Sequence, residues 1–138
     1  MAQGVRLDAA IMFVRDLSTS LSFYQDVLAL EVIDSNATAA LLGNDDGTQL
    51  ILRAMGGSTP HTLGTLGVQY VAWTAASEAD LDQCERLLKE RSAFAERRTT
   101  ENMTVVEGRD PDDIVVIITY PGTGKAPLHE LPARIYAW

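Results

Sequence analysis

One order of secondary-structure elements occurs twice along this chain, and it restricts the possible folds more than any other feature. In the first copy, an apolar run at residues 7–14 predicts a strand, and Asp16-Leu17-Ser18 predicts the start of a helix. The apolar residues of this helix recur at helical spacing and are expected to form its buried stripe: Leu17, Leu21, Tyr24, Val27 and Leu28. Turn-forming residues then separate three further strand-like runs, at residues 30–34, 38–42 and 49–53. The first copy therefore predicts a β-α-β-β-β unit.

The second copy predicts the same order, beginning with an apolar run at residues 67–75. Ser77-Glu78-Ala79-Asp80 resembles a capping box, and the apolar residues after it recur at helical spacing. Three more strands are expected, at residues 94–97, 103–107 and 114–120. A linker rich in Gly, Ser and Thr, residues 55–66, separates the copies, and a tail, residues 122–138, follows them.

Each unit has one helix, which can cover only one face of its sheet, so the second face needs another partner. We therefore expect an α+β fold. Two tandem β-α-β-β-β units, at about residues 5–54 and 67–121, are expected to form a curved eight-stranded mixed sheet with the helices on its convex face. A chain of 138 residues is expected to make this a single domain, whose concave surface can hold a ligand.

Composition argues against several classes of partner. The formal net charge is −8 and acidic residues outnumber basic ones in both halves, so no nucleic-acid partner is expected. Cys84 is the only cysteine, which excludes an internal disulfide and multi-cysteine metal sites. The longest uncharged stretch, residues 54–77, contains Pro60 and several glycines, so no membrane partner is expected. The first residues lack the apolar run of a secretory signal, and a cytoplasmic location is expected.

Three short motifs accompany the duplicated order. They are Val14-Arg15-Asp16-Leu17, Ser20-Leu21-Ser22-Phe23-Tyr24 and the turn Asp110-Pro111-Asp112-Asp113. Over about residues 7–121, the chain thereby resembles the vicinal oxygen chelate superfamily, which includes glyoxalase I, extradiol dioxygenases, fosfomycin-modifying enzymes and bleomycin-resistance proteins. Asp113 stands where this turn usually has glycine. The resemblance also implies a homodimer.

The resemblance further implies metal ligands, usually His or Glu, on the first and last strand of each unit. Carried over one at a time, these positions fall at Ala9, Ile51, Tyr70 and Ile117. The aliphatic side chains cannot bind a divalent cation, and a phenol is a poor lone ligand at neutral pH. Because a metal site needs three or four converging donors, we expect no metal and no cofactor.

Residues two apart on a strand share a face, so the neighbours of these positions are expected on the concave side. The residues of opposite parity are expected to face the helices: Met12, Leu50, Leu52, Trp73, Val116 and Ile118. That surface would be mostly apolar with one phenol and one guanidinium, which suits a flat or aromatic ligand. Arg53 could bind a carboxylate, phenolate or sulfate through two hydrogen bonds. The expected ligand-binding residues are Ala9, Ile11, Phe13, Gln49, Ile51, Arg53, Tyr70, Thr74, Ile117 and Thr119. Alternatively, the apolar members form plain core and Arg53 is a solvated strand-end residue.

The other reactive side chains are weaker candidates. Cys84 is expected on the buried stripe of the second helix, as a small core residue and not a nucleophile. Glu107 and Asp110 are candidates for a base at the rim of the cavity. His61 in the linker and His129 in the tail are expected at the surface.

Three functions stay open. The one we favour is a metal-free protein that sequesters a small aromatic antibiotic or metabolite, similar to the bleomycin-resistance members. Net acidity would attract a cationic ligand and Arg53 would oppose one, so the charge of the ligand is undecided. The second is a lyase, isomerase or dioxygenase that uses non-standard acid and base residues, such as Tyr70 or Glu107, or a non-standard metal site. The third is a structural or regulatory module whose groove is filled by a partner peptide or by the apolar end of the tail, residues 131–138.

Overall fold

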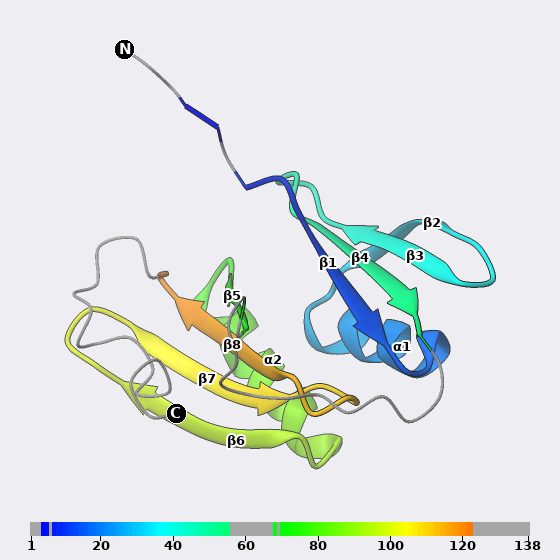
Figure 1. The fold of residues 1–138 in the computed structure, drawn as a ribbon. Helices are drawn as coiled ribbons and strands as arrows, with labels where there is room; N and C mark the ends of the chain where they lie inside the picture. Colours follow the sequence, from blue (N-terminus) through cyan, green and yellow to red (C-terminus); the bar gives the residue numbers. More distant parts are fainter. Residues whose placement is uncertain (1–3, 6, 56–67, 69, 123–138) are drawn as a thin grey trace. The chain divides into compact units, whose positions relative to one another are not determined.

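The computed structural model describes residues 4, 5, 7–55, 68 and 70–122 and divides the chain into two compact units, Met1–Thr59 (unit 1) and Pro60–Trp138 (unit 2). In each unit a helix follows the first strand, and three further strands follow the helix (Figure 1). The expected α+β fold with two tandem β-α-β-β-β units is thus confirmed, with one four-stranded mixed sheet in each unit. Neither helix in the described part is long and apolar enough to cross a membrane.

Unit 1 contains one sheet with the strand order β1-β4-β3-β2. The first and last strands of the unit, β1 and β4, are parallel neighbours, and the other two pairs are antiparallel. This order follows from the crossover through the helix, which returns the chain to the opposite edge of the sheet. The elements are β1 (Ala9–Val14), α1 (Leu17–Val27), β2 (Glu31–Ser35), β3 (Ala39–Gly43) and β4 (Gln49–Ala54).

Helix α1 begins where the sequence predicts, because Asp16 caps it. The Asp16 carboxylate accepts hydrogen bonds from the backbone N–H groups of Ser18 (3.0 Å) and Thr19 (3.4 Å). Tyr24 and Val27 of the expected stripe are buried, but Ser20 and Phe23 complete the buried side of the helix in place of the expected leucines. The fully buried residues of α1 are Ser20, Phe23, Tyr24 and Val27. The expected Leu17, Leu21 and Leu28 are only half-buried.

Unit 2 repeats the arrangement with the strand order β5-β8-β7-β6 and a parallel β5–β8 pair. The core strand β8 is buried along nearly its whole length, on both faces of the sheet. The elements are β5 (Val71–Thr74), α2 (Glu78–Glu90), β6 (Phe94–Thr99), β7 (Thr104–Arg109) and β8 (Val115–Tyr120).

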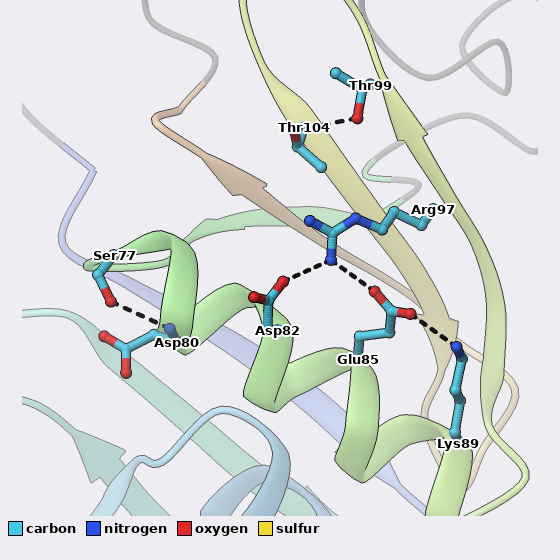
Figure 2. A network of polar contacts seen from close by, with 8 residues as sticks. All are labelled: Ser77, Asp80, Asp82, Glu85, Lys89, Arg97, Thr99 and Thr104. Atoms are coloured by element: carbon cyan, nitrogen blue, oxygen red, sulfur yellow. Dashed lines mark hydrogen bonds and ion pairs between the residues drawn. The ribbon is translucent and has the colours of Figure 1, made fainter.

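Helix α2 is fixed to its sheet by apolar and polar contacts. Leu81 and Leu88 are fully buried, and the Ser77 hydroxyl caps the helix by accepting from the Asp80 N–H at 3.1 Å. Figure 2 shows how Arg97 of β6 joins the helix, donating to Asp82 at 2.8 Å and to Glu85 at 2.7 Å. The second carboxylate oxygen of Glu85 accepts from Lys89 at 2.8 Å. These hydrogen bonds lower the pKa of Glu85 below its ordinary value.

The turn between β7 and β8 depends on Asp110. Its carboxylate accepts from the backbone N–H groups of Asp112 (2.8 Å) and Ile114 (2.9 Å). Asp113, at the position where glycine is usual, adopts a φ of 67° in the left-handed region. Asp113 therefore occupies a backbone region that glycine adopts most readily, and Asp tolerates this region better than most residues.

Candidate functional site

One face of the unit 1 sheet brings together six of the ten sequence-predicted ligand residues. The parallel register pairs Ala9 with Gln49, Ile11 with Ile51, and Phe13 with Arg53. The alternate residues of β4 pack under α1 and are fully buried, so the six lie on the opposite face. Strand β3 adds Ala39, paired with Arg53, and Leu41, paired with Ile51. We call this set of eight residues the unit 1 face.

The unit 1 face presents large apolar side chains to solvent. Ile11 is 63% exposed and Phe13 is 60% exposed, while Leu41 and Ile51 are half-buried. Single exposed apolar side chains are common on protein surfaces, whereas contiguous exposed apolar patches often mark a surface that binds a ligand or another protein. The face as a whole is therefore a candidate binding surface, with Arg53 at one end of it.

Four of the six positions that strand alternation assigns to the helix-facing side are fully buried. Leu50, Leu52, Val116 and Ile118 are buried at 1% exposure or less. Met12 is half-buried and lies toward α1, where its sulfur is 4.0 Å from the Tyr24 hydroxyl. The sixth predicted position, Trp73, is half-buried.

The four predicted ligand residues of unit 2 are placed differently from those of unit 1. Thr74 pairs with Thr119, and Tyr70 packs against an apolar cluster that includes Ile117. Ile117 and Thr119 have 0% exposure, and the Thr119 hydroxyl donates to the Trp73 carbonyl at 3.2 Å. Their surroundings in this structure are those of core residues, so contact between them and a ligand stays a prediction. The cluster comprises Met103, Val105, Val115 and Ile117, with Tyr70 against it.

Glu107 is the carboxylate closest to these residues in register. It lies on β7 directly opposite Ile117 and is 6% exposed. Alternation therefore places it on the same face as the apolar cluster. Asp110, the other proposed base, uses a carboxylate oxygen to hold the turn, which assigns it a structural role.

At the four positions where the sequence resemblance implies metal ligands, the side chains present do not fit a divalent cation. Ala9, Ile51 and Ile117 have no donor atom in their side chains, and Tyr70 packs against the apolar cluster. Within the described ranges, no group of three or more His, Cys, Asp or Glu side chains converges. A site built on these four positions would lack the donors that Zn²⁺, Mg²⁺ or Ca²⁺ needs.

Cys84 is half-buried and so is not the fully buried core residue that the helical spacing predicts, since α2 fully buries only Leu81 and Leu88. Burial raises the pKa of the Cys84 thiol to about 11, and the negative charge of Asp80 adds to the effect, so Cys84 is not an activated nucleophile. His61, His129 and the apolar segment 131–138 lie outside the described residues.

Sequence reasoning missed the contribution of β3 to the unit 1 face. Ala39 and Leu41 lie between the predicted residues of β4 and the edge strand β2. Strand alternation within residues 38–42 could have predicted this contribution, because residues 39 and 41 lie two apart and share the face that points away from the helix.

Comparisons with known proteins agree with this architecture. Residues 6–118 match the family model described as Glyoxalase/Bleomycin resistance protein/Dioxygenase superfamily. No curated protein matches the chain.

Solved structures include several similar folds at low sequence identity. A glyoxalase/dioxygenase from Nostoc punctiforme is 20% identical over 86% of this chain and 94% of that chain, with a TM-score of 0.74. A glyoxylase/bleomycin resistance protein/dioxygenase domain from Frankia sp. EAN1pec is 22% identical over 86% and 92%, with a TM-score of 0.72. The oxidase ChaP-H1 is 22% identical over 88% and 99%, with a TM-score of 0.69. At these identities the likeness extends to the fold and no further.

Proposed function

Because the chain belongs to the glyoxalase/bleomycin resistance protein/dioxygenase superfamily, we propose that it binds a small aromatic molecule without a resident divalent metal. The observation that carries this proposal is that Ala9, Ile51 and Ile117, at three positions where the resemblance implies metal ligands, have no donor atom in their side chains. A protein that lacks these donors cannot use a bound cation to polarise a substrate at this place. Contact area and stacking remain as sources of affinity.

The unit 1 face supports this kind of binding. Phe13 offers an aromatic ring that is 60% exposed, with Ile11, Leu41 and Ile51 as apolar neighbours. Such a surface recognises a ligand by its shape and apolar area, with few polar groups to fix its orientation. In the cell, this activity would be sequestration of an antibiotic or metabolite, as the bleomycin-resistance part of the family name suggests, and we expect a homodimer to perform it.

Two measurements on the purified full chain test the proposal. Elemental analysis is expected to find no stoichiometric Zn, Ni, Mn or Fe, and a chelator is expected to leave the melting temperature unchanged. Native mass spectrometry, with mass analysis of the released ligand, is expected to show a small molecule that leaves the protein chemically unaltered. Stoichiometric metal, or a released molecule that the protein has modified, would contradict the proposal.

A second function, catalysis by a carboxylate, is favoured by the position of Glu107. This side chain is 6% exposed and lies opposite Ile117, among the apolar residues of unit 2. A buried carboxylate on an apolar sheet face could serve as a general base toward a bound substrate. If it does, Glu107→Gln abolishes turnover and leaves ligand affinity unchanged, with Glu96→Gln on the neighbouring strand as the matched control. Equal turnover in both variants would exclude this function for Glu107.

A further inference from the structure

Arg53 differs from the other basic residues that the structure describes. Several of the others form ion pairs, such as Arg97 with Asp82 and Glu85, Lys89 with Glu85, and Arg109 with Asp113. In the described part of the chain, the Arg53 side chain alone among the basic ones has no ion pair, hydrogen bond or ring contact. This is notable in a protein of net charge −8, which has an excess of carboxylates to offer.

No carboxylate is a direct register neighbour of Arg53 on the described face of the sheet. Its direct neighbours in register are Phe13 on β1 and Ala39 on β3, both apolar. The acidic residues Glu31 and Asp34 share this face but lie on β2, and β3 separates them from β4. Arg53 thus presents a guanidinium with unused donors at the edge of an apolar surface.

The spacing of the strands brings this guanidinium close to an aromatic surface. Adjacent strands lie about 4.8 Å apart, so Arg53 and Phe13 are direct neighbours, and Ile11 follows about 6.6 Å along β1. An aromatic ligand with a single ring or with two fused rings is long enough to reach from Ile11 to Arg53. Its ring would lie on Phe13, Ile11 and Ile51, while an acidic substituent would reach Arg53.

We infer that the ligand of the unit 1 face is a planar aromatic carboxylate, oriented by two hydrogen bonds from Arg53. This inference rests on the proposed binding function and settles the charge that the sequence left open. A guanidinium pairs with a carboxylate in a fork geometry that a neutral or cationic ligand cannot reproduce. The net negative charge of the chain favours a cationic ligand, whereas Arg53 favours an anionic one. The charge of the preferred ligand therefore shows which of these two effects dominates at the unit 1 face.

The test compares three probes of the same ring and different charge: naphthoate, naphthamide and naphthylmethylamine. Each is titrated at low ionic strength into the isotopically labelled full chain, and amide chemical shifts give both the affinity and the place of binding. We expect naphthoate to bind about tenfold more tightly than naphthamide, with the largest shifts in β1 and β4. Naphthylmethylamine is expected to bind most weakly.

Substitutions then test whether Arg53 is the side chain that causes the preference for naphthoate over naphthamide. Arg53→Gln is expected to remove the preference for naphthoate and to leave the affinity for naphthamide unchanged, whereas Arg53→Lys retains part of the preference. Arg86→Gln, which makes the same change of charge on the exposed side of α2, is the control and is expected to bind all probes like the wild type. Phe13→Leu is expected to weaken all three probes by a similar factor.

The outcomes distinguish failure of this inference from failure of the proposed function. Tighter binding of naphthylmethylamine, a preference that survives Arg53→Gln, or shifts outside β1 and β4 would overturn the inference and leave a ligand-binding protein. If none of the probes binds, the proposed function fails with the inference. Concentration-dependent broadening of β1 and β4 signals without a probe would instead assign the face to a second copy of the chain, and would overturn the inference too.

Discussion

Asp113 shows how one residue can occupy a backbone conformation that favours glycine. Its φ of 67° costs a β-branched residue more than it costs Asp or Gly. We predict that Asp113→Val lowers the free energy of unfolding by about 1–2 kcal/mol, and that Asp113→Gly changes it by less than about 0.5 kcal/mol. Urea denaturation measures both. Asp113→Asn removes the charge but tolerates the same φ, so it is expected to match the wild type. A Val variant as stable as the Asn variant would show that the turn relaxes.

Cys84 is the residue whose chemistry responds most to its surroundings. Burial and the charge of Asp80 raise its pKa from 9.0 to about 11, so its thiolate is scarce at neutral pH. We predict that a disulfide reagent at about pH 8 labels Cys84 about 100-fold more slowly than the same thiol in the denatured chain. Absorbance of the released thiolate measures both rates, and equal rates would show that the partial burial of Cys84 does not protect its thiol.

Because of this raised pKa, the free energy of unfolding is expected to decrease at alkaline pH. A pKa that is higher in the folded state favours the neutral thiol there. The contribution is therefore complete below about pH 9 and is lost as the pH rises through about 11. Cys84→Ala is expected to reduce this alkaline loss of stability.

At the scale of elements, Gly108 determines how closely α2 approaches its sheet. A Cβ atom at this position of β7 would lie 2.7 Å from the Leu88 side chain and 2.8 Å from the Ala93 carbonyl oxygen. The Leu88 side chain can rotate, but the backbone carbonyl cannot move without shifting the segment after α2. We predict that Gly108→Ala lowers the free energy of unfolding by about 1–3 kcal/mol. Chemical denaturation followed by circular dichroism measures the change.

The control for Gly108 is a substitution of similar size at an exposed position of the neighbouring strand. Ala95→Ser in β6 is expected to leave stability within about 0.5 kcal/mol of the wild type. If Gly108→Ala is as stable as this control, α2 adjusts its distance from the sheet, and close packing at Gly108 is not required.

The order and type of the elements could be predicted because local signals specify them. Asp16 and Ser77 cap the two helices, and Asn- and Asp-rich turns end the strands, so the expected runs lie within a few residues of the observed ones. The buried stripe of α1 was less predictable. Ser20 is polar but 1% exposed, and Leu17 and Leu21 are only half-buried, because the sheet beneath the helix decides which side faces the core.

At the scale of the whole molecule, the candidate site shows what a duplicated pattern cannot specify. Alternation predicted which face each residue of unit 1 occupies, and the register placed Ile11, Phe13 and Arg53 together as expected. The same rule assigned Ile117 and Thr119 to a ligand surface, yet both have 0% exposure. Equivalent positions in the two units thus differ in burial. Burial depends on what covers a face, and the pattern of one strand carries no information about that.

Net charge gives a prediction for the molecule as a whole. A charge of −8 on a chain of this size repels itself in the folded state, and salt screens this repulsion. The ion pairs between Arg97 and α2 act in the opposite direction, but they are partly exposed and contribute little. We therefore predict that raising the salt concentration from about 0.01 M to about 0.15 M increases the melting temperature by roughly 2–4 °C, which is about 0.5–1 kcal/mol.

Arg97→Met separates the two electrostatic effects. It removes the attraction that salt would weaken and makes the net charge more negative, so its melting temperature should rise more steeply with salt than that of the wild type. The same variant should also lose part of the acid-dependent stability, because the hydrogen bond from Lys89, the larger cause of the lowered Glu85 pKa, remains while the one from Arg97 is lost. The lowered pKa of Glu85 contributes stability that is present above its ordinary pKa and is lost as the pH falls through the lowered one. A wild-type melting temperature that decreases with salt would mean that local ion pairs outweigh the repulsion of the whole chain.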